Sequence, residues 1–97
     1  MAGAETIKEI MMFVPDDYTD VIETGTFLGQ STREFANLYD TVHTIELDKD
    51  LSEFAEKGMK NDGYENITCW VGDCAQILPR LITDYNKNFS DKKVLFY

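Results

Sequence analysis

The sequence predicts an α/β protein built on a parallel sheet, and three observations lead to this class. Short runs rich in β-branched residues alternate with longer amphipathic runs along most of the chain. Gly, Asp and Asn, which favour turns, separate the runs. The 97 residues contain no internal repeat, low-complexity segment or linker, so the chain fits one domain. Strands that alternate with helices are typical of right-handed βαβ units, whose strands lie parallel in one sheet.

The elements are expected in a regular order along the chain. A short helix over 6–13 comes first and ends before Pro15. Strands and helices then alternate, and β-branched and apolar content places the strands. They are expected at 20–24, 41–46, 67–71 and 93–97. In the helix before the third strand, Leu51 and Phe54 begin an apolar face at helical spacing, and the turn signal at 61–63 should end that helix.

Local signals predict where the helices begin. Ser31 with Glu34 forms a capping box, so the helix after the first strand is expected to start there. Asp50 with Glu53 repeats the arrangement at the start of the next helix. Pro79 fits a first turn but not a helix interior, so the helix after the third strand should start late or have an irregular first turn.

Composition argues against several kinds of partner and site. Nine Lys and Arg against eighteen Asp and Glu give a formal net charge of −9, which repels nucleic-acid phosphates and anionic lipid headgroups. The first residues mix charges with apolar side chains, so they read as neither a signal peptide nor a membrane span, and a cytoplasmic location is expected. Cys69, Cys74 and His43, the single histidine, are too few and wrongly spaced for zinc. No metal site is expected.

The stretch 21–31, VIETGTFLGQS, lies where the first strand turns into a helix. Gly25 and Gly29 in such a turn let the backbone approach a ligand, and the helix start presents free N–H groups to an anion. Glu23 supplies a hydrogen-bond acceptor at the mouth of the same turn. Glu46 ends the second strand, where an acidic side chain in such folds accepts both hydroxyls of a ribose. The pattern predicts a site with an anion-binding end and a ribose-binding end.

The glycines do not complete a dinucleotide fingerprint. Phe27 stands where G-x-G-x-x-G needs its second glycine, and the Gly-Lys-Ser/Thr ending of a P-loop is absent. Glu23 facing a cationic amine, with Ser31 and the helix start facing a carboxylate, is the arrangement that an amino-acid nucleoside requires. The favoured ligand therefore has a nucleoside, an amine and a carboxylate but no pyrophosphate.

Three motifs now show that the chain resembles the class I S-adenosylmethionine-dependent methyltransferases. Residues 23–31, ETGTFLGQS, are similar to the first motif of that family. Residues 44–48, TIELD, are similar to its second-strand motif, and residues 72–79, GDCAQILP, to its third-strand turn. The last segment resembles the small-molecule O-methyltransferase branch in particular. The motifs are specific in combination rather than singly, and the resemblance covers about residues 20–97.

The resemblance implies a Rossmann-like parallel sheet whose first four strands lie in the order 3-2-1-4, with helices on both faces. It also implies S-adenosyl-L-methionine as the cofactor. Glu23 would approach the methionine amine, Ser31 the carboxylate and Glu46 the ribose, while Asp73 and Cys74 would contact the adenine. The full set of cofactor-binding residues that it implies is Glu23, Gly25, Thr26, Gly29, Ser31, Glu46, Leu47, Asp73 and Cys74.

These residues also have purely structural explanations, which stay open. Gly25 and Gly29 can be turn formers, and Ser31 and Asp73 can be helix caps. Glu46 can be a solvated charge at the end of a strand.

The family's domain has seven strands, of which this chain matches the first four. Residues 1–97 are therefore expected to be a single partial domain, the cofactor-binding N-terminal half, truncated within its fourth strand. In the family the residues that hold the methyl acceptor, here expected to be a small molecule, come later. The isolated chain is thus expected to be inactive, and its catalytic residues are not identified. An open fourth-strand edge would favour a homo-oligomer.

Two other classes of function stay open. One is a non-catalytic nucleoside- or nucleotide-binding α/β module. The other is an assembly protein that uses the open edge of the sheet.

Overall fold

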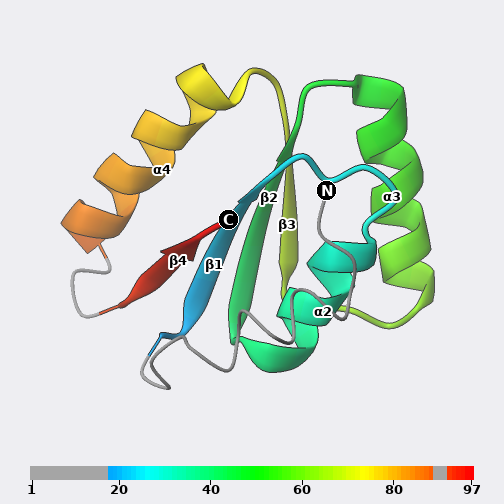
Figure 1. Cartoon of the computed structure of the whole chain (residues 1–97), viewed down its shortest axis with the longest axis horizontal. Coiled ribbons are helices and arrows are strands. Elements are labelled where there is room, and N and C mark those ends of the chain that lie inside the picture. The colour runs from blue at the N-terminus through cyan, green and yellow to red at the C-terminus, as the bar shows by residue number, and fades with distance from the viewer. Residues whose placement is uncertain (1–17, 89–91) are drawn as a thin grey trace.

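A computed structural model describes residues 18–88 and 92–97, and at its centre is a four-stranded parallel sheet (Figure 1). The strands are β1 (Asp20–Thr24), β2 (Thr41–Glu46), β3 (Ile67–Val71) and β4 (Val94–Phe96). Their order across the sheet is β3-β2-β1-β4, and every neighbouring pair is parallel. The predicted sheet and strand order are confirmed, although β4 is shorter than expected.

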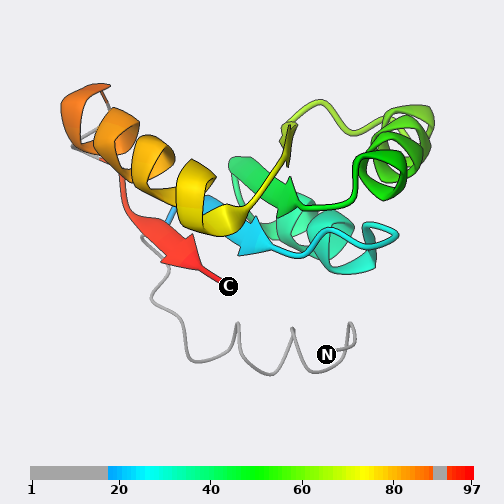
Figure 2. The same cartoon turned by 90° about the horizontal axis from the view of Figure 1, so that it is seen from above.

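Helices cover both faces of this sheet, as predicted. The helices α2 (Gln30–Leu38) and α3 (Lys49–Asn61) lie on one face, and α4 (Cys74–Asn88) lies on the other (Figure 2). The helix expected at 6–13 falls outside the described residues.

The core consists of two small apolar clusters, one on each face of the sheet. On one face Val21 and Val42 pack against Phe35 of α2. On the other face Ile22 and Ile45 pack against Leu81 of α4. Because side chains alternate along a strand, Val21 and Ile22 supply opposite clusters. Each central strand thus supplies one aliphatic residue to each face, and the same strands carry buried polar residues such as Glu23 and Thr44.

The start of α2 differs from the prediction. The helix begins at Gln30, and its N-cap is Gly29, which adopts a left-handed backbone (φ 83°) and makes no side-chain cap bond. Ser31 therefore lies inside the first turn, and the capping box with Glu34 was wrong. A tight turn in which the Gly29 N–H donates to the carbonyl of Thr26 (2.8 Å) starts the helix instead.

The start of α3 is also earlier than predicted. Its N-cap is Asp48, whose carboxylate accepts the N–H of Leu51 at 3.0 Å. The predicted cap, Asp50, lies in the first turn, where a negative charge still suits the helix dipole. The helix ends at Asn61, and Gly63 follows with φ 89°, as the turn signal predicts.

Of the two alternatives predicted for α4, a late start and an irregular first turn, the late start was wrong, because the helix runs from Cys74 and contains Pro79. The carbonyl of Asp73 accepts the N–H groups of both Gln76 and Ile77, at 2.9 and 3.0 Å. A 3₁₀-type bond thus accompanies the first α-helical bond, as is frequent at the N-terminus of a helix.

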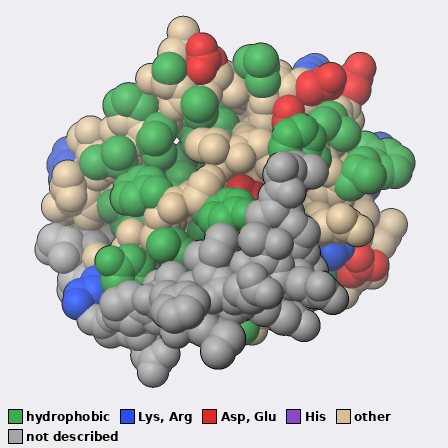
Figure 3. All heavy atoms as spheres, in the orientation of Figure 1, with side chains coloured by type: hydrophobic (Ala, Val, Ile, Leu, Met, Phe, Trp, Pro, Cys, Tyr) green, Lys and Arg blue, Asp and Glu red, His purple; other side chains and the backbone are tan. Residues whose placement is uncertain are grey.

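The outer edge of β4 is open in the described part of the chain, where β4 pairs with β1 alone. Phe96 at this edge is 53% exposed, and Ile82 of α4 is 38% exposed. Figure 3 shows hydrophobic side chains gathered over α4 and β4. Apolar surface therefore continues from the helix to the sheet edge.

Candidate functional site

The carboxyl ends of β1, β2 and β3 surround a pocket of about 180 Å³. Ligands of open parallel sheets bind at this end of the strands. The pocket is lined by Thr24, Gly25, Phe27, Ile45, Glu46, Leu47, Gly72, Asp73 and Cys74. Three separate strand ends thus contribute to one site.

Five of the nine predicted cofactor-binding residues line this pocket. They are Gly25, Glu46, Leu47, Asp73 and Cys74. Leu47 is 74% exposed although it is apolar, and Asp73 and Cys74 are exposed beside it. An exposed apolar side chain with polar neighbours can cover one face of a flat, partly polar ligand such as a nucleobase.

Glu46 is the buried acid of the pocket. One carboxylate oxygen, Oε1, accepts the N–H of Phe27 at 3.0 Å, and the other, Oε2, accepts the N–H of Asp48 at 3.1 Å. Two backbone bonds thus fix the direction of the carboxylate. Each oxygen can accept a further hydrogen bond, so Glu46 can still receive two hydroxyl groups from a ligand.

Gly25 follows β1 in a left-handed conformation (φ 86°), and its N–H donates to the carbonyl of Ile45 at 2.7 Å. A Cβ atom at this position would lie 2.9 Å from the ring of Phe27. The turn therefore needs glycine for its backbone angle and for its space.

Glu23 lies behind the loop rather than in the pocket. Its side chain is buried, and Oε1 accepts hydrogen bonds from the hydroxyl groups of Thr32 and Thr44. Burial raises the pKa of Glu23, and these two hydrogen bonds oppose that rise. Thr26 is buried in the same network, with its hydroxyl 2.7 Å from that of Thr44.

Gly29 and Ser31 also lie away from the pocket lining, at the N-terminus of α2. Gly29 is buried and Ser31 is half-buried. Arg33 in the same helix donates to the carbonyl of Leu28 at 3.0 Å and pairs with Asp62 at 2.8 Å. This side chain ties the glycine loop to the end of α3.

Asp73 combines two of the predicted features, because it lines the pocket and caps α4. Its carboxylate accepts the N–H of Ala75 at 2.9 Å. Gly72 before it has φ 145°, and a Cβ atom there would lie 2.9 Å from the side chain of Ile77.

Four lining residues were not among the predicted set: Thr24, Phe27, Ile45 and Gly72. Their positions at or just after strand ends would have been a usable signal for three of them. Phe27 stood out in the sequence only as a missing glycine, which gave no indication of where its ring would lie.

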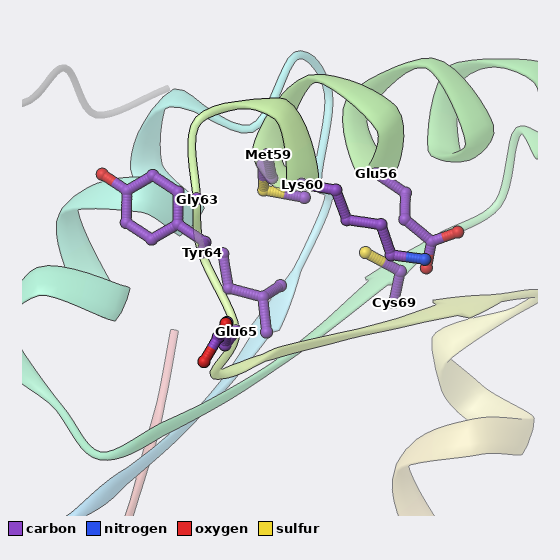
Figure 4. A pocket seen from close by; sticks show the side chains of 8 residues that line it. Glu56, Met59, Lys60, Gly63, Tyr64, Glu65 and Cys69 are labelled. Carbon is purple, nitrogen blue, oxygen red and sulfur yellow. The ribbon is translucent and has the colours of Figure 1, made fainter.

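A larger cavity of about 350 Å³ lies elsewhere, between α3, β3 and the turn that joins them (Figure 4). Glu56, Lys60 and Cys69 lie close together on one side of it. Burial raises the pKa of the Cys69 thiol to about 11, and the negative charge of Glu56 adds to the rise. The thiol is therefore protonated and unreactive near neutral pH. We favour the smaller pocket as the functional site because glycine turns and strand-end acids converge there, whereas the larger cavity has no such arrangement.

His43 lies on the α4 face of the sheet and is not part of either cavity lining. Its Nδ1 accepts the indole N–H of Trp70 at 3.0 Å, and burial lowers its pKa. In residues 18–88 and 92–97 no three metal-ligating side chains gather into a cluster. Within the same residues, no helix has the length and apolar character to cross a membrane.

Comparison with known proteins gives two curated relatives, both named protein-L-isoaspartate O-methyltransferase, while no family model matches. The protein from Dictyoglomus turgidum is 45% identical over 53 residues, covering 55% of this chain and 24% of its own length. The protein from Roseiflexus castenholzii is 34% identical over 71 residues, covering 73% of this chain and 32% of its own length. The chain thus spans about a quarter to a third of these relatives.

Solved structures share the fold at low sequence identity. A putative caffeoyl-CoA O-methyltransferase from Staphylococcus aureus aligns with a TM-score of 0.67 and 21% identity, covering 80% of this chain and 38% of that protein. A putative methyltransferase from Streptococcus mutans, solved with S-adenosylhomocysteine (SAH), aligns with a TM-score of 0.66 and 14% identity, covering 82% and 45%. The curated relatives are named for a protein substrate, so they do not support the small-molecule acceptor expected from the sequence.

Proposed function

Because the chain has the N-terminal part of the class I S-adenosylmethionine-dependent methyltransferase fold, we propose that it binds S-adenosyl-L-methionine in the pocket between the ends of β1, β2 and β3. One observation carries the proposal. Gly25, Glu46 and Asp73 come from three strand ends far apart in sequence and line a single pocket. An approachable backbone, a ribose acceptor and a polar group for a base are the parts that such a nucleoside needs.

In this proposal each part of the ligand has a place. The amino-acid part lies along the backbone at Gly25, and the ribose hydroxyls donate to Glu46. Leu47, Asp73 and Cys74 surround the adenine. The remaining predicted residues, Glu23, Thr26, Gly29 and Ser31, support the loop from behind and from the start of α2.

The alternative function, a nucleotide-binding module, can be distinguished from the proposed one by the ligand that binds. Calorimetric titration of the chain with SAH and, separately, with NAD compares an amino-acid nucleoside with a dinucleotide. We expect a binding signal with SAH and none with NAD, because Phe27 stands where the dinucleotide fingerprint needs its second glycine. Binding of NAD in preference to SAH would contradict the proposal, as would the absence of any SAH binding.

For the methyl acceptor, we propose the L-isoaspartyl carboxylate of a protein, since both curated relatives carry that name. The small-molecule acceptor is the alternative, and the motif at 72–79 favours it. Transfer of a labelled methyl group to an isoaspartyl peptide, compared with catechol, phenol and sugar acceptors, distinguishes the two. Transfer to a catechol and not to the peptide would favour the small-molecule acceptor.

A further inference from the structure

Phe27 has an unusual backbone for its residue type. Among the described residues it is the single non-glycine residue with a positive φ, at 51°. L-residues with bulky side chains are disfavoured in this conformation, and such outliers gather at functional sites. The conformation is held by the N–H of Phe27, which donates to Glu46 Oε1 at 3.0 Å.

The ring of Phe27 lines the pocket and is not part of the apolar core. It lies against the backbone of Gly25, so close that a Cβ atom there would be 2.9 Å from the ring. The side chain is 49% exposed and belongs to neither core cluster. Packing therefore does not account for an aromatic residue at this position, whereas a ligand in the pocket would cover the exposed ring.

We propose that the ring of Phe27 recognises the positively charged sulfonium of S-adenosylmethionine and strengthens binding of this cofactor relative to SAH. The inference rests on the proposed function, because it assigns a role within the same pocket. An aromatic ring attracts a cation at its face through its quadrupole, and a neutral thioether gains little from it. The ring of Phe27 lies beside Gly25, where the amino-acid part is proposed, and its N–H bonds Glu46, where the ribose is proposed. The sulfonium joins these two parts of the ligand.

The preference has a consequence for turnover. Methyl transfer converts the sulfonium into the neutral thioether of SAH, so the attraction to the ring disappears when the reaction is complete. The ring would therefore help the product to leave and the next cofactor to bind.

The test compares the two ligands rather than measuring one affinity. S-Adenosylmethionine and SAH are titrated separately into the wild-type chain and into Phe27→Leu, which removes the aromatic face but keeps an apolar side chain. We expect Phe27→Leu to weaken S-adenosylmethionine binding about two- to fivefold, the range for an exposed cation–π contact, with SAH affinity unchanged. Phe27→Tyr should keep the wild-type ratio.

Two further variants make the result decisive. Phe54→Leu changes a Phe that is 68% exposed on α3, outside the pocket, and should alter neither affinity. Phe27→Gly also removes the ring, and glycine adopts the positive φ of this position without strain. It replaces Phe27→Leu in the test if that variant does not fold. An equal loss for both ligands, or no loss for either, would overturn the role of Phe27 while leaving the proposed function intact. If the wild-type chain binds neither ligand, the proposed function itself fails and this inference fails with it.

Discussion

Glu46 shows at the scale of one residue how a side chain can be fixed by the fold and still serve a ligand. If it accepts both ribose hydroxyls, Glu46→Ala should weaken SAH binding by ~2–3 kcal/mol, the range for hydrogen bonds to a charged group. Calorimetry measures the change. The same substitution removes the acceptor of the Phe27 and Asp48 N–H groups, so a moderate fall in thermal stability is also expected.

Two controls accompany this prediction. Glu53→Ala removes an exposed acid of α3 outside the pocket and should leave SAH affinity unchanged. Glu46→Gln keeps one acceptor oxygen and should fall between the wild-type and Glu46→Ala chains. An unchanged dissociation constant in folded Glu46→Ala would rule out the ribose assignment.

Glu23 makes stability depend on pH. Burial raises its pKa in the folded state above the value of about 4.3 expected in the unfolded chain. Between these two values the folded state binds more protons, so stability falls as pH rises from about 4.3 through the folded pKa. Glu23→Gln keeps an acceptor for Thr32 and Thr44 and should remove this fall.

Urea unfolding of both chains over a series of pH values measures the effect. The free energy of unfolding of Glu23→Gln relative to wild type should rise across the window and then stay level. Glu65→Gln, at an exposed position, should show the wild-type dependence. Parallel profiles for Glu23→Gln and wild type would contradict the account of Glu23.

At the scale of elements, Arg33 couples the loop before α2 to the end of α3. Its guanidinium bonds the Leu28 carbonyl and pairs with Asp62, and the Arg33 side chain is 24% exposed. Arg33→Ala should lower the free energy of unfolding by ~1 kcal/mol, because it removes two charge-assisted bonds, of which the one to Asp62 is open to solvent.

A double-mutant cycle separates the ion pair from the other contacts of Arg33. The Arg33–Asp62 coupling should be ~0.5–1 kcal/mol. The exposed Lys49–Glu53 pair, at 3.9 Å, is the matched control and should give a coupling near zero. Equal couplings for the two pairs would mean that Arg33 does not act as a specific link.

The elements themselves were largely predictable from the sequence, but the helix starts were not. Strands β1, β2 and β3 have the expected bounds because β-branched runs between turn residues leave little choice. At α2 two nearby residues suit the N-cap position: Ser31, whose hydroxyl can bond a backbone N–H, and Gly29, which adopts a left-handed backbone easily. In the structure Gly29 is the N-cap. A capping motif in sequence does not reveal such competition, because the path of the loop depends on contacts such as that of Arg33 with Leu28.

The pocket was predictable where a residue follows directly from the end of a strand. Gly25, Glu46 and Asp73 come together because parallel strands bring their carboxyl ends to one edge. Glu23 pairs in register with Thr44, two residues before Glu46, so its side chain lies further from the strand ends, where the hydroxyl groups of Thr32 and Thr44 donate to it. Those two partners come from other elements, and spacing along the chain does not indicate them.

At the scale of the whole molecule, the open edge of β4 should govern how the purified 97-residue chain behaves. In the described ranges 18–88 and 92–97 no strand pairs with the outer edge of β4, and such an edge beside an exposed Phe96 favours pairing with another copy. Sedimentation is expected to give a mass that rises with concentration. Phe96→Lys places a charge at the edge and should shift the equilibrium towards monomer.

A matched change elsewhere tests whether the edge is responsible. Leu38→Lys places the same charge at a 54% exposed apolar position of α2, away from β4, and should leave the association unchanged. A wild-type chain that stays monomeric at all concentrations would contradict the role of the edge.

The claim that the strand ends bind S-adenosylmethionine-type ligands is tested most directly by NMR. An ¹⁵N-labelled chain is titrated with SAH while its backbone amide shifts are followed. We predict the largest shifts at Gly25, Leu47 and Asp73, with much smaller shifts at Tyr64 and Cys69 beside the larger cavity. Shifts confined to that cavity, or no shifts at saturating SAH, would contradict the account.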